Sequence, residues 1–373
     1  MAPSIQPALQ RRQKRPRGDY SQSPLLVFFE VTRACDLVCD HCRACAQSEP
    51  ASNELSTQQA IQLIDELTEF GSPPMLVLTG GDPLKRSDIF DLVQYAVSRR
   101  LNVSITPSAT PLVTPAALYR LRRAGISRLA VSIDGADSQT HDTRRGVAGS
   151  FDRTLRILGD AYAEGIPAQV NTTITPQNAN QIDRMADLLA EQRIVMWSVF
   201  FLVPTGRAFF SPRLSAEQCE DAFKRLWRQS KRQTYAIKTT AAPHYRRFVK
   251  QRETKERNAG SRAGPLTYAP LGLNDGNGVM FISHCGDIYP SGFMPIFCGR
   301  FPNAHLVRVY QDSPLFRGLR NTDRLQGKCK ICEFRNVCGG SRARAYAVTG
   351  NPYSEEPDCA YVPDSIARSR NTR

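Results

Sequence analysis

Six short apolar segments, each followed by a stretch of helical periodicity, fill the chain between residues 25 and 202. The segments are rich in Val, Ile and Leu and predict strands, while the spacing of apolar residues between them predicts helices, for instance over 57–70 and 114–123. Strands that alternate with helices imply a parallel sheet, because parallel neighbours need crossover connections. The sequence thus predicts an α/β fold, best fitted by a partial (βα)6 barrel of the TIM type. The predicted strands are residues 25–32, 75–79, 101–106, 129–133, 168–174 and 195–202.

The character of the sequence changes after residue 202. A helical, basic stretch leads into a passage rich in Gly, Asn and Pro, and a hairpin is predicted around residues 281–290. The Cys-rich, loop-rich segment beyond it is too poor in apolar residues for a large core, so we expect a metal to stabilise it. We divide the chain into a disordered basic tail (1–24), the barrel (25–205), a helical linker region (206–278), a small Cys-rich domain (279–363) and a second tail (364–373).

Positive charge exceeds negative charge, with 49 Lys and Arg residues against 35 Asp and Glu and a net charge of +14. This excess favours anionic partners, which include nucleic acid, acidic peptides and carboxylate-rich small molecules. The basic residues near the start lack the apolar run of a secretory signal, and no segment approaches the ~20 apolar residues needed to cross a bilayer. We therefore expect a cytoplasmic protein with no membrane partner.

The eleven cysteines are unevenly distributed, with four between residues 35 and 45, one at 219 and six between 285 and 359. Disulfides rarely persist in a reducing compartment, so clustered thiols there indicate metal binding or catalysis. Disulfide frameworks are seldom so polarised. The two clusters are therefore the candidate sites.

Cys35, Cys39 and Cys42 follow the first predicted strand and are spaced to converge from one loop. A structural zinc site usually has four ligands, whereas three thiolates on a four-iron cluster leave one iron open to a ligand. A zinc site completed by Cys45 or His41 is the alternative on spacing alone. The position favours an active site, because barrel chemistry takes place in the loops that leave the strands.

The second predicted strand ends in the sequence Thr-Gly-Gly-Asp-Pro, residues 79–83. Two glycines can bring backbone groups close to a ligand, although the same sequence is also typical of a simple tight turn. Together, the three-cysteine loop and this turn resemble the radical S-adenosylmethionine (SAM) superfamily, over residues from about 25 to 363. The resemblance implies a [4Fe-4S] cluster on Cys35, Cys39 and Cys42, with the amino and carboxylate groups of SAM on its fourth iron.

The same resemblance suggests which other residues contact SAM. Gly80, Gly81 and Asp82 are expected near the methionine amino group, largely through backbone, although family members more often have Glu at the last position. Arg145, in preference to Arg144, is expected near the SAM carboxylate, and His41 is expected to pack beside the cluster. The residues expected near the ribose and adenine, each of which could equally be a capping or turn residue, are Thr106, Ser108, Ser132, Asp134 and Asn171.

The second cysteine cluster comprises Cys329, Cys332, Cys338 and Cys359, and four thiols are enough for a closed zinc site. Behind a radical SAM barrel, however, this spacing resembles the SPASM extension, in which these cysteines hold an auxiliary [4Fe-4S] cluster. A second auxiliary cluster would need a cysteine where Arg342 stands. Cys285 and Cys298 alone cannot hold one, so a single auxiliary cluster is expected.

The segment from Cys338 to Tyr346 and the missing second cluster resemble the haem-biosynthesis branch, which acts on propionate side chains of tetrapyrroles. A reducing electron donor of the flavodoxin or ferredoxin type is then implied. Guanidinium groups suit an anionic substrate, although each basic side chain could equally be a solvated surface charge. The candidate basic residues are Arg207, His244, Arg246, Arg247, Arg342 and Arg344.

Two other functions stay open on the sequence. SPASM enzymes that modify ribosomally made peptides share the same cysteine patterns, so the substrate could be a peptide instead of a small molecule. A zinc-stabilised, non-catalytic protein that binds nucleic acid would also explain the charge and the paired cysteines. Against nucleic acid, the charge is spread over the chain and no recognised nucleic-acid module is present.

Overall fold

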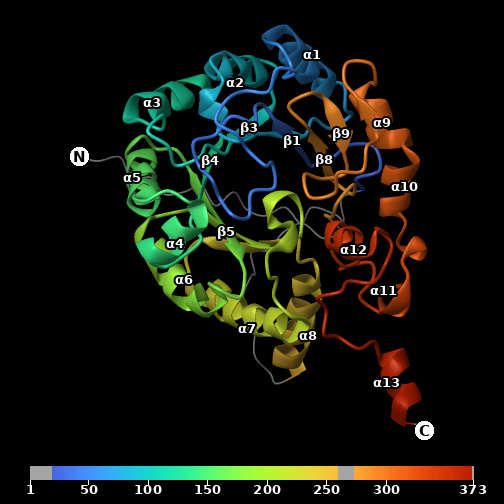
Figure 1. The fold of residues 1–373 in the computed structure, drawn as a ribbon. Helices are drawn as coiled ribbons and strands as arrows, with labels where there is room; N and C mark the ends of the chain where they lie inside the picture. Colours follow the sequence, from blue (N-terminus) through green and yellow to red (C-terminus); the bar gives the residue numbers. More distant parts are fainter. Residues whose placement is uncertain (1–18, 259–272, 372–373) are drawn as a thin grey trace.

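A parallel sheet forms the centre of the molecule in the computed structural model, which describes residues 19–258 and 273–371. All six predicted strands are present and pair in chain order, which confirms the predicted α/β partial barrel (Figure 1). The full sheet has ten strands in the order β10-β9-β8-β1-β2-β3-β4-β5-β6-β7. The strands are β1 (Leu26–Glu30), β2 (Met75–Thr79), β3 (Asn102–Ile105), β4 (Arg128–Ser132), β5 (Ala168–Ile174), β6 (Met196–Phe201), β7 (Ala236–Thr240), β8 (Val279–Ile282), β9 (Asp287–Tyr289) and β10 (Gly299–Arg300).

Helices α1 to α8 follow one another around the outside of the sheet, and α9 to α12 lie between α8 and α1 (Figure 1). Local signals fix their starts: Ser56 and Gln59 form a capping box at α1, and Thr114 caps α3 ahead of Pro115. The helices are α1 (Thr57–Thr68), α2 (Ile89–Ser98), α3 (Pro115–Ala124), α4 (Ser138–Arg145), α5 (Ser150–Ala163), α6 (Ile182–Glu191), α7 (Ala216–Arg232), α8 (His244–Asn258), α9 (Leu306–Asp312), α10 (Pro314–Arg320), α11 (Gly327–Ile331), α12 (Arg342–Thr349) and α13 (Asp364–Asn371).

The sheet has an outer face that is dry and an inner face that is partly open to solvent. Side chains alternate between the faces along each strand. In β5, Val170 and Ile174 are fully buried in the core beneath the helices, whereas Gln169, Asn171 and Thr173 are only partly buried. The sequence therefore builds a solid core outside the sheet and a polar, accessible surface inside it.

Two regions differ from the predicted division of the chain. Helices α7 and α8 form in the region expected to be a helical linker, but β7 lies between them and pairs in parallel with β6. The segment expected to belong only to the Cys-rich domain contributes β8, which pairs in parallel with β1. The predicted hairpin of β8 and β9 is present. Only one side chain of β7, Ile237, is fully buried, which is why its apolar signal was too weak to predict a strand.

The ends of the chain also differ from simple tails. Residues 1–18 of the expected basic tail lie outside the described residues, but the Tyr310 hydroxyl donates a 2.6 Å hydrogen bond to the Tyr20 carbonyl. Near the other end, α13 occupies part of the expected second tail. Among the described helices, none is long and apolar enough to cross a membrane.

Candidate functional site

The loop after β1 brings three cysteines together at the end of the barrel where the strands finish. Cys35 and Cys39 are buried and Cys42 is partly buried, and they pack with Leu37 and Val147. The Ser108 hydroxyl lies 3.3 Å from the Cys35 sulfur, and the Ala46 N–H donates to the Cys42 sulfur at 3.4 Å. Burial raises the pKa of Cys35 and Cys39 in the protein without metal. Thiolates here therefore need a positive group to stabilise them, which an iron–sulfur cluster supplies.

The two extra ligands of the zinc alternative lie in surroundings that differ from those of the three cysteines. Cys45 is exposed. The His41 ring nitrogens lie 2.7 Å from an Asp40 oxygen and 3.2 Å from an Asp134 oxygen. Within residues 19–258 and 273–371, no three His, Cys, Asp or Glu side chains are placed to hold a single metal ion. Since zinc binds its ligands at about 2.0 to 2.3 Å, the arrangement suits an extended cluster better than one ion.

The Gly-Gly-Asp-Pro turn packs directly on the cysteine loop. The Gly81 and Asp82 N–H groups donate to the Thr32 and Ala34 carbonyls at 2.9 and 2.6 Å. A Cβ on Gly80 would lie 2.4 Å from the Thr32 carbonyl oxygen, and one on Gly81 would lie 2.3 Å from that of Ala34. The glycines are thus required for contact between two loops. The turn and the cysteine loop form one unit.

Asp82 is fully buried, and its carboxylate is bound within the chain. It accepts hydrogen bonds from the Thr110 hydroxyl at 2.6 Å and from the Leu84 N–H at 3.1 Å. Burial raises the pKa of Asp82. Its side chain therefore caps the turn and is not free for a ligand.

A buried ion pair lies beside the cysteines. Arg145, the last residue of α4, places one guanidinium nitrogen 2.7 Å from an Asp134 oxygen and another 3.7 Å from the Cys39 sulfur. Burial alone would raise the pKa of Asp134, but the charges of Arg145 and His41 outweigh it and hold that pKa far below its usual value. Arg144 pairs with Asp40 at 3.2 Å instead. Of the two arginines, only Arg145 contacts a cysteine of the loop.

The remaining predicted SAM contacts lie on or near the inner face. Ser132 and Asn171 are register partners on β4 and β5, and Ser198 of β6 continues the same row. Thr106 follows β3 and is partly buried. Ser108 donates to the Gly81 carbonyl at 2.9 Å, which links it to the turn as well as to Cys35. The structure thus brings these residues to one end and one face of the barrel.

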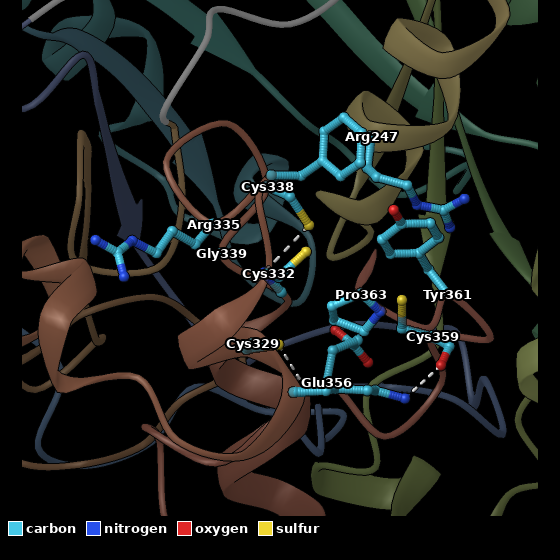
Figure 2. Close-up of a pocket in the computed structure, with 13 residues that line it drawn as sticks. Arg247, Cys329, Cys332, Arg335, Cys338, Gly339, Glu356, Cys359, Tyr361 and Pro363 are labelled. Atoms are coloured by element: carbon cyan, nitrogen blue, oxygen red, sulfur yellow. Dashed lines mark hydrogen bonds between the residues drawn. The ribbon is translucent and has the colours of Figure 1, made fainter. Parts of the chain in front are cut away.

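Cys329, Cys332, Cys338 and Cys359 line one cavity, together with Arg247 and Tyr361 (Figure 2). Backbone N–H groups of Gly340 and Glu356 donate to the Cys338 and Cys329 sulfurs, both at 3.3 Å. Burial raises the pKa of all four thiols, that of Cys332 to about 11. Four thiols around one pocket, with N–H donors already directed at two of the sulfurs, fit an auxiliary cluster.

The sequence did not identify Glu356 and Lys328, which also line this cavity. Lys328 donates to the Cys359 carbonyl at 2.5 Å. The available signal was proximity alone, because Lys328 adjoins Cys329 and Glu356 precedes Cys359 by three residues.

The position of the missing second-cluster ligand holds a buried arginine. Arg342 is 1% exposed and donates to the Pro352 and Ser354 carbonyls at 2.9 and 2.7 Å. Cys298 donates to the Ile296 carbonyl, and Cys285 lies next to Ser283 and Asp287. Arg342 thus organises the chain where a fourth ligand would be needed.

The structure does not support a substrate role for these six basic side chains, because the five arginines bind groups of the chain and His244 is fully buried. Arg207 is partly buried, and the other five side chains are buried and are not solvated surface charges. Arg344 is fully buried and pairs with Glu356 and Asp358, each at 3.0 Å. Neighbouring carbonyls and carboxylates likewise bind the other arginines, and burial lowers the pKa of His244 to about 3. The partners are the Cys39 and Ala46 carbonyls for Arg207, the Val337 and Leu273 carbonyls for Arg246, and Glu220 for Arg247.

The sequence is similar to one protein family and to several characterised enzymes. Residues 29–189 match the family model described as Radical SAM superfamily. An AdoMet-dependent heme synthase of Methanosarcina barkeri is 38% identical, over 92% of this chain and 98% of that protein. An Fe-coproporphyrin III synthase of the same organism is 30% identical, over 91% of this chain and 89% of that protein.

Solved structures share the fold. Streptococcus suis SuiB bound to S-adenosylmethionine superposes with a TM-score of 0.69 at 19% identity, covering 91% of this chain and 78% of that one. SuiB has also been solved bound to its precursor peptide SuiA.

Proposed function

This chain belongs to the radical SAM superfamily, and from that premise we propose that it oxidatively removes carboxylates from the propionate side chains of a tetrapyrrole. As a superfamily member it is an enzyme that uses a [4Fe-4S] cluster and SAM. The observation that carries the substrate proposal is the 38% identity to a heme synthase along nearly the whole of both chains.

The cluster would be held by Cys35, Cys39 and Cys42, whose sulfurs converge from one loop. When bound, cluster and SAM together supply a 5′-deoxyadenosyl radical after one-electron reduction. Arg145 would offset the negative charge of the thiolates, and Asp134 would hold Arg145 in place. The backbone of the Gly80–Asp82 turn and the side chains of Thr106, Ser108, Ser132 and Asn171 would orient SAM on the inner face.

The proposed reaction converts one propionate side chain into a vinyl group. Transfer of one hydrogen atom from the propionate carbon next to the ring to the 5′-deoxyadenosyl radical would give 5′-deoxyadenosine and leave a carbon radical. Cleavage of the bond to the carboxylate then releases carbon dioxide, forms a vinyl group and liberates one electron. An auxiliary [4Fe-4S] cluster in the cavity of Cys329, Cys332, Cys338 and Cys359 would accept that electron.

We further assign residues 25–205 to the radical SAM barrel and 279–363 to the auxiliary-cluster region, with β7 and β8 extending the sheet at its two sides. A cytoplasmic location, where a flavodoxin or ferredoxin donor would be available, belongs to the same proposal. Neither nucleic acid nor membrane has a part in it.

The test is anaerobic turnover of the iron-loaded enzyme with dithionite and SAM. We expect 5′-deoxyadenosine in every case, and carbon dioxide only when Fe-coproporphyrin III is present. A colourless protein that binds only zinc would contradict the enzyme assignment. Formation of 5′-deoxyadenosine with no change in the tetrapyrrole would contradict the substrate.

A peptide substrate is the second candidate, supported by the fold shared with SuiB, which binds its precursor peptide. The same assay decides between them when small peptides encoded near the gene replace the tetrapyrrole. A mass change in a peptide, with the tetrapyrrole untouched, would favour the peptide.

A further inference from the structure

Two cationic side chains, Lys238 of β7 and Arg128 of β4, belong to the inner face of the barrel. The register places Lys238 opposite Ser198 of β6, which in turn lies opposite Asn171 of β5. Lys238 therefore continues the row of Ser132 and Asn171, two residues proposed to orient SAM. It is only partly buried, so the ammonium group can meet a ligand on this face.

Arg128 begins β4 and reaches along the same face. Its guanidinium donates to the Gln169 side-chain oxygen at 3.3 Å and lies 3.6 Å from the Met196 sulfur. Its Nε is buried without a hydrogen-bond partner among the described residues. Burial and the nearby charge of Arg128 lower the pKa of Lys238 to about 8, so Lys238 is still mostly protonated at neutral pH.

No carboxylate compensates these charges. Across residues 19–258 and 273–371, neither side chain has an Asp or Glu oxygen within 4.0 Å. The sequence of residues 1–18 and 259–272 contains no Asp or Glu. Among the other buried cations, Arg145 and Arg344 each have a carboxylate at 2.7 to 3.0 Å, whereas Arg342 and Arg246 donate to backbone carbonyls. Burying two cations on one face without an anion costs free energy, and proteins usually avoid it unless a ligand completes the site.

We propose that Lys238 and Arg128 form an anion site that binds one carboxylate of the substrate on the inner face of the barrel. The inference rests on the proposed function, because it takes a propionate side chain of the tetrapyrrole as the ligand. Lys238 supplies a compact charge and Arg128 supplies N–H donors, a pairing that suits a carboxylate oxygen pair.

In this site Lys238 and Arg128 bind and orient the substrate, and they take no part in the reaction itself. Lys238 lies in the same row of the sheet as Ser132 and Asn171. A carboxylate bound by Lys238 would therefore lie on the same surface as the proposed SAM contacts. A tetrapyrrole with several propionates could anchor one of them here and present another to the radical. The site therefore selects for a substrate with more than one carboxylate.

The test compares Lys238→Met and Arg128→Gln with the wild-type enzyme, all loaded with iron under anaerobic conditions. Binding of Fe-coproporphyrin III and of its tetramethyl ester is measured by absorbance titration. We expect each variant to bind the acid about 10- to 100-fold more weakly, which is the range for losing a charge-assisted hydrogen bond. The ester, which has no carboxylates, should bind the variants and the wild type alike.

Thermal unfolding separates this role from a structural one. Removing an uncompensated cation should leave the melting temperature unchanged or raise it, whereas loss of a structural residue lowers it. Lys238→Arg should restore most of the affinity for the acid. Lys255→Met, an exposed change on α8, is the control and should match the wild type throughout.

Each outcome has a distinct meaning. If the wild type binds the acid and the variants bind it equally well, the anion site is wrong while the proposed function stands. If acid and ester weaken together, or the melting temperature falls, the effect is structural and the anion site is again wrong. If the wild type binds no tetrapyrrole, the proposed function and the anion site fail together.

Discussion

Single residues in this enzyme decide where charge can be buried. Arg145 is the clearest case, since it bridges Asp134 and the Cys39 sulfur. Removing one member of a buried ion pair leaves the other without compensation. Arg145→Met should therefore lower the free energy of unfolding by about 3 to 5 kcal/mol, measured by urea denaturation of the full chain.

Arg144→Met is the matched control for that change. Arg144 adjoins Arg145 in the sequence, but its partner Asp40 is about half exposed, with a side-chain accessibility of 51%. Water can solvate Asp40 after the change, so the loss should be clearly smaller. Equal losses for the two variants would contradict the special position of Arg145.

His141 gives a prediction about pH. The Asp134 N–H donates to its Nδ1 at 3.1 Å, so this nitrogen must be unprotonated. Burial, helped by the charge of Arg145, lowers the pKa of His141 to about 4. The unfolded chain binds this proton near pH 6.5, so the stabilising contribution is complete above that pH. It is lost as the pH falls toward 4, by ~3 kcal/mol in all.

Urea denaturation between pH 7 and 4.5 measures this dependence. His141→Asn keeps an acceptor but cannot take up the proton, so its stability should fall less steeply over the same range. A variant with the wild-type slope would show that other groups cause the pH dependence.

At the scale of elements, the periodicity of the sequence predicted the six barrel strands because each carries several fully buried apolar side chains. β7 was not predicted because Lys238 and Thr240 on its inner face are polar and only Ile237 is fully buried. Because the strand was not predicted, Lys238 was not recognised as a candidate ligand. A strand whose side chains line a functional site carries polar residues there, so it departs from the apolar pattern by which strands are predicted.

The cysteine motifs predicted the family, which the match to the Radical SAM model confirms. They could not predict how the neighbouring charges are used. Arg342 and Arg344 suggested substrate binding, yet both are buried against carbonyls and carboxylates. Composition shows that a guanidinium is present, but its partner comes from residues far apart in the sequence.

The contact between the Gly-Gly-Asp-Pro turn and the cysteine loop can be tested with Gly81→Ala. The new methyl group would lie 2.3 Å from the Ala34 carbonyl oxygen, so one of the two loops must move. We expect a loss of about 1 to 3 kcal/mol in the free energy of unfolding, together with weaker SAM binding by isothermal titration.

Gly71→Ala is the control, because nothing lies within 4 Å of its Cβ position. This variant should unfold within about 0.5 kcal/mol of the wild type. If Gly81→Ala were as mild, the two loops would not be a rigid unit.

At the scale of the whole molecule, the C-terminal region lies beside the open barrel and does not form a separate body. The described sheet ends at β7 on one side and at β10 on the other. Helices α9 to α12 fill the space between α8 and α1 (Figure 1). The Leu306 N–H at the start of α9 donates to a Glu66 oxygen of α1 at 2.9 Å. The C-terminal region is therefore anchored to the barrel that would hold SAM.

Arg344 is the strongest of these anchors. From α12 it donates to the Phe201 carbonyl at the end of β6 and to the Ala241 carbonyl after β7, at 3.2 and 2.8 Å. It also pairs with Glu356 and Asp358, which lie three residues and one residue before Cys359. One buried side chain thus connects two barrel strands to the segment that carries a cluster ligand.

Arg344→Met should consequently affect two measurements together. Glu356 and Asp358 would lose their buried partner, so the free energy of unfolding should fall by about 3 to 5 kcal/mol. The segment leading to Cys359 should then move toward solvent, and iron content should drop from about eight to about four atoms per chain, the content of one four-iron cluster. Arg232→Met, which removes a pair exposed on both sides and lies outside the cavity, is the control and should keep all its iron. Full iron retention in Arg344→Met despite lower stability would mean that the four cysteines hold their geometry independently of the barrel.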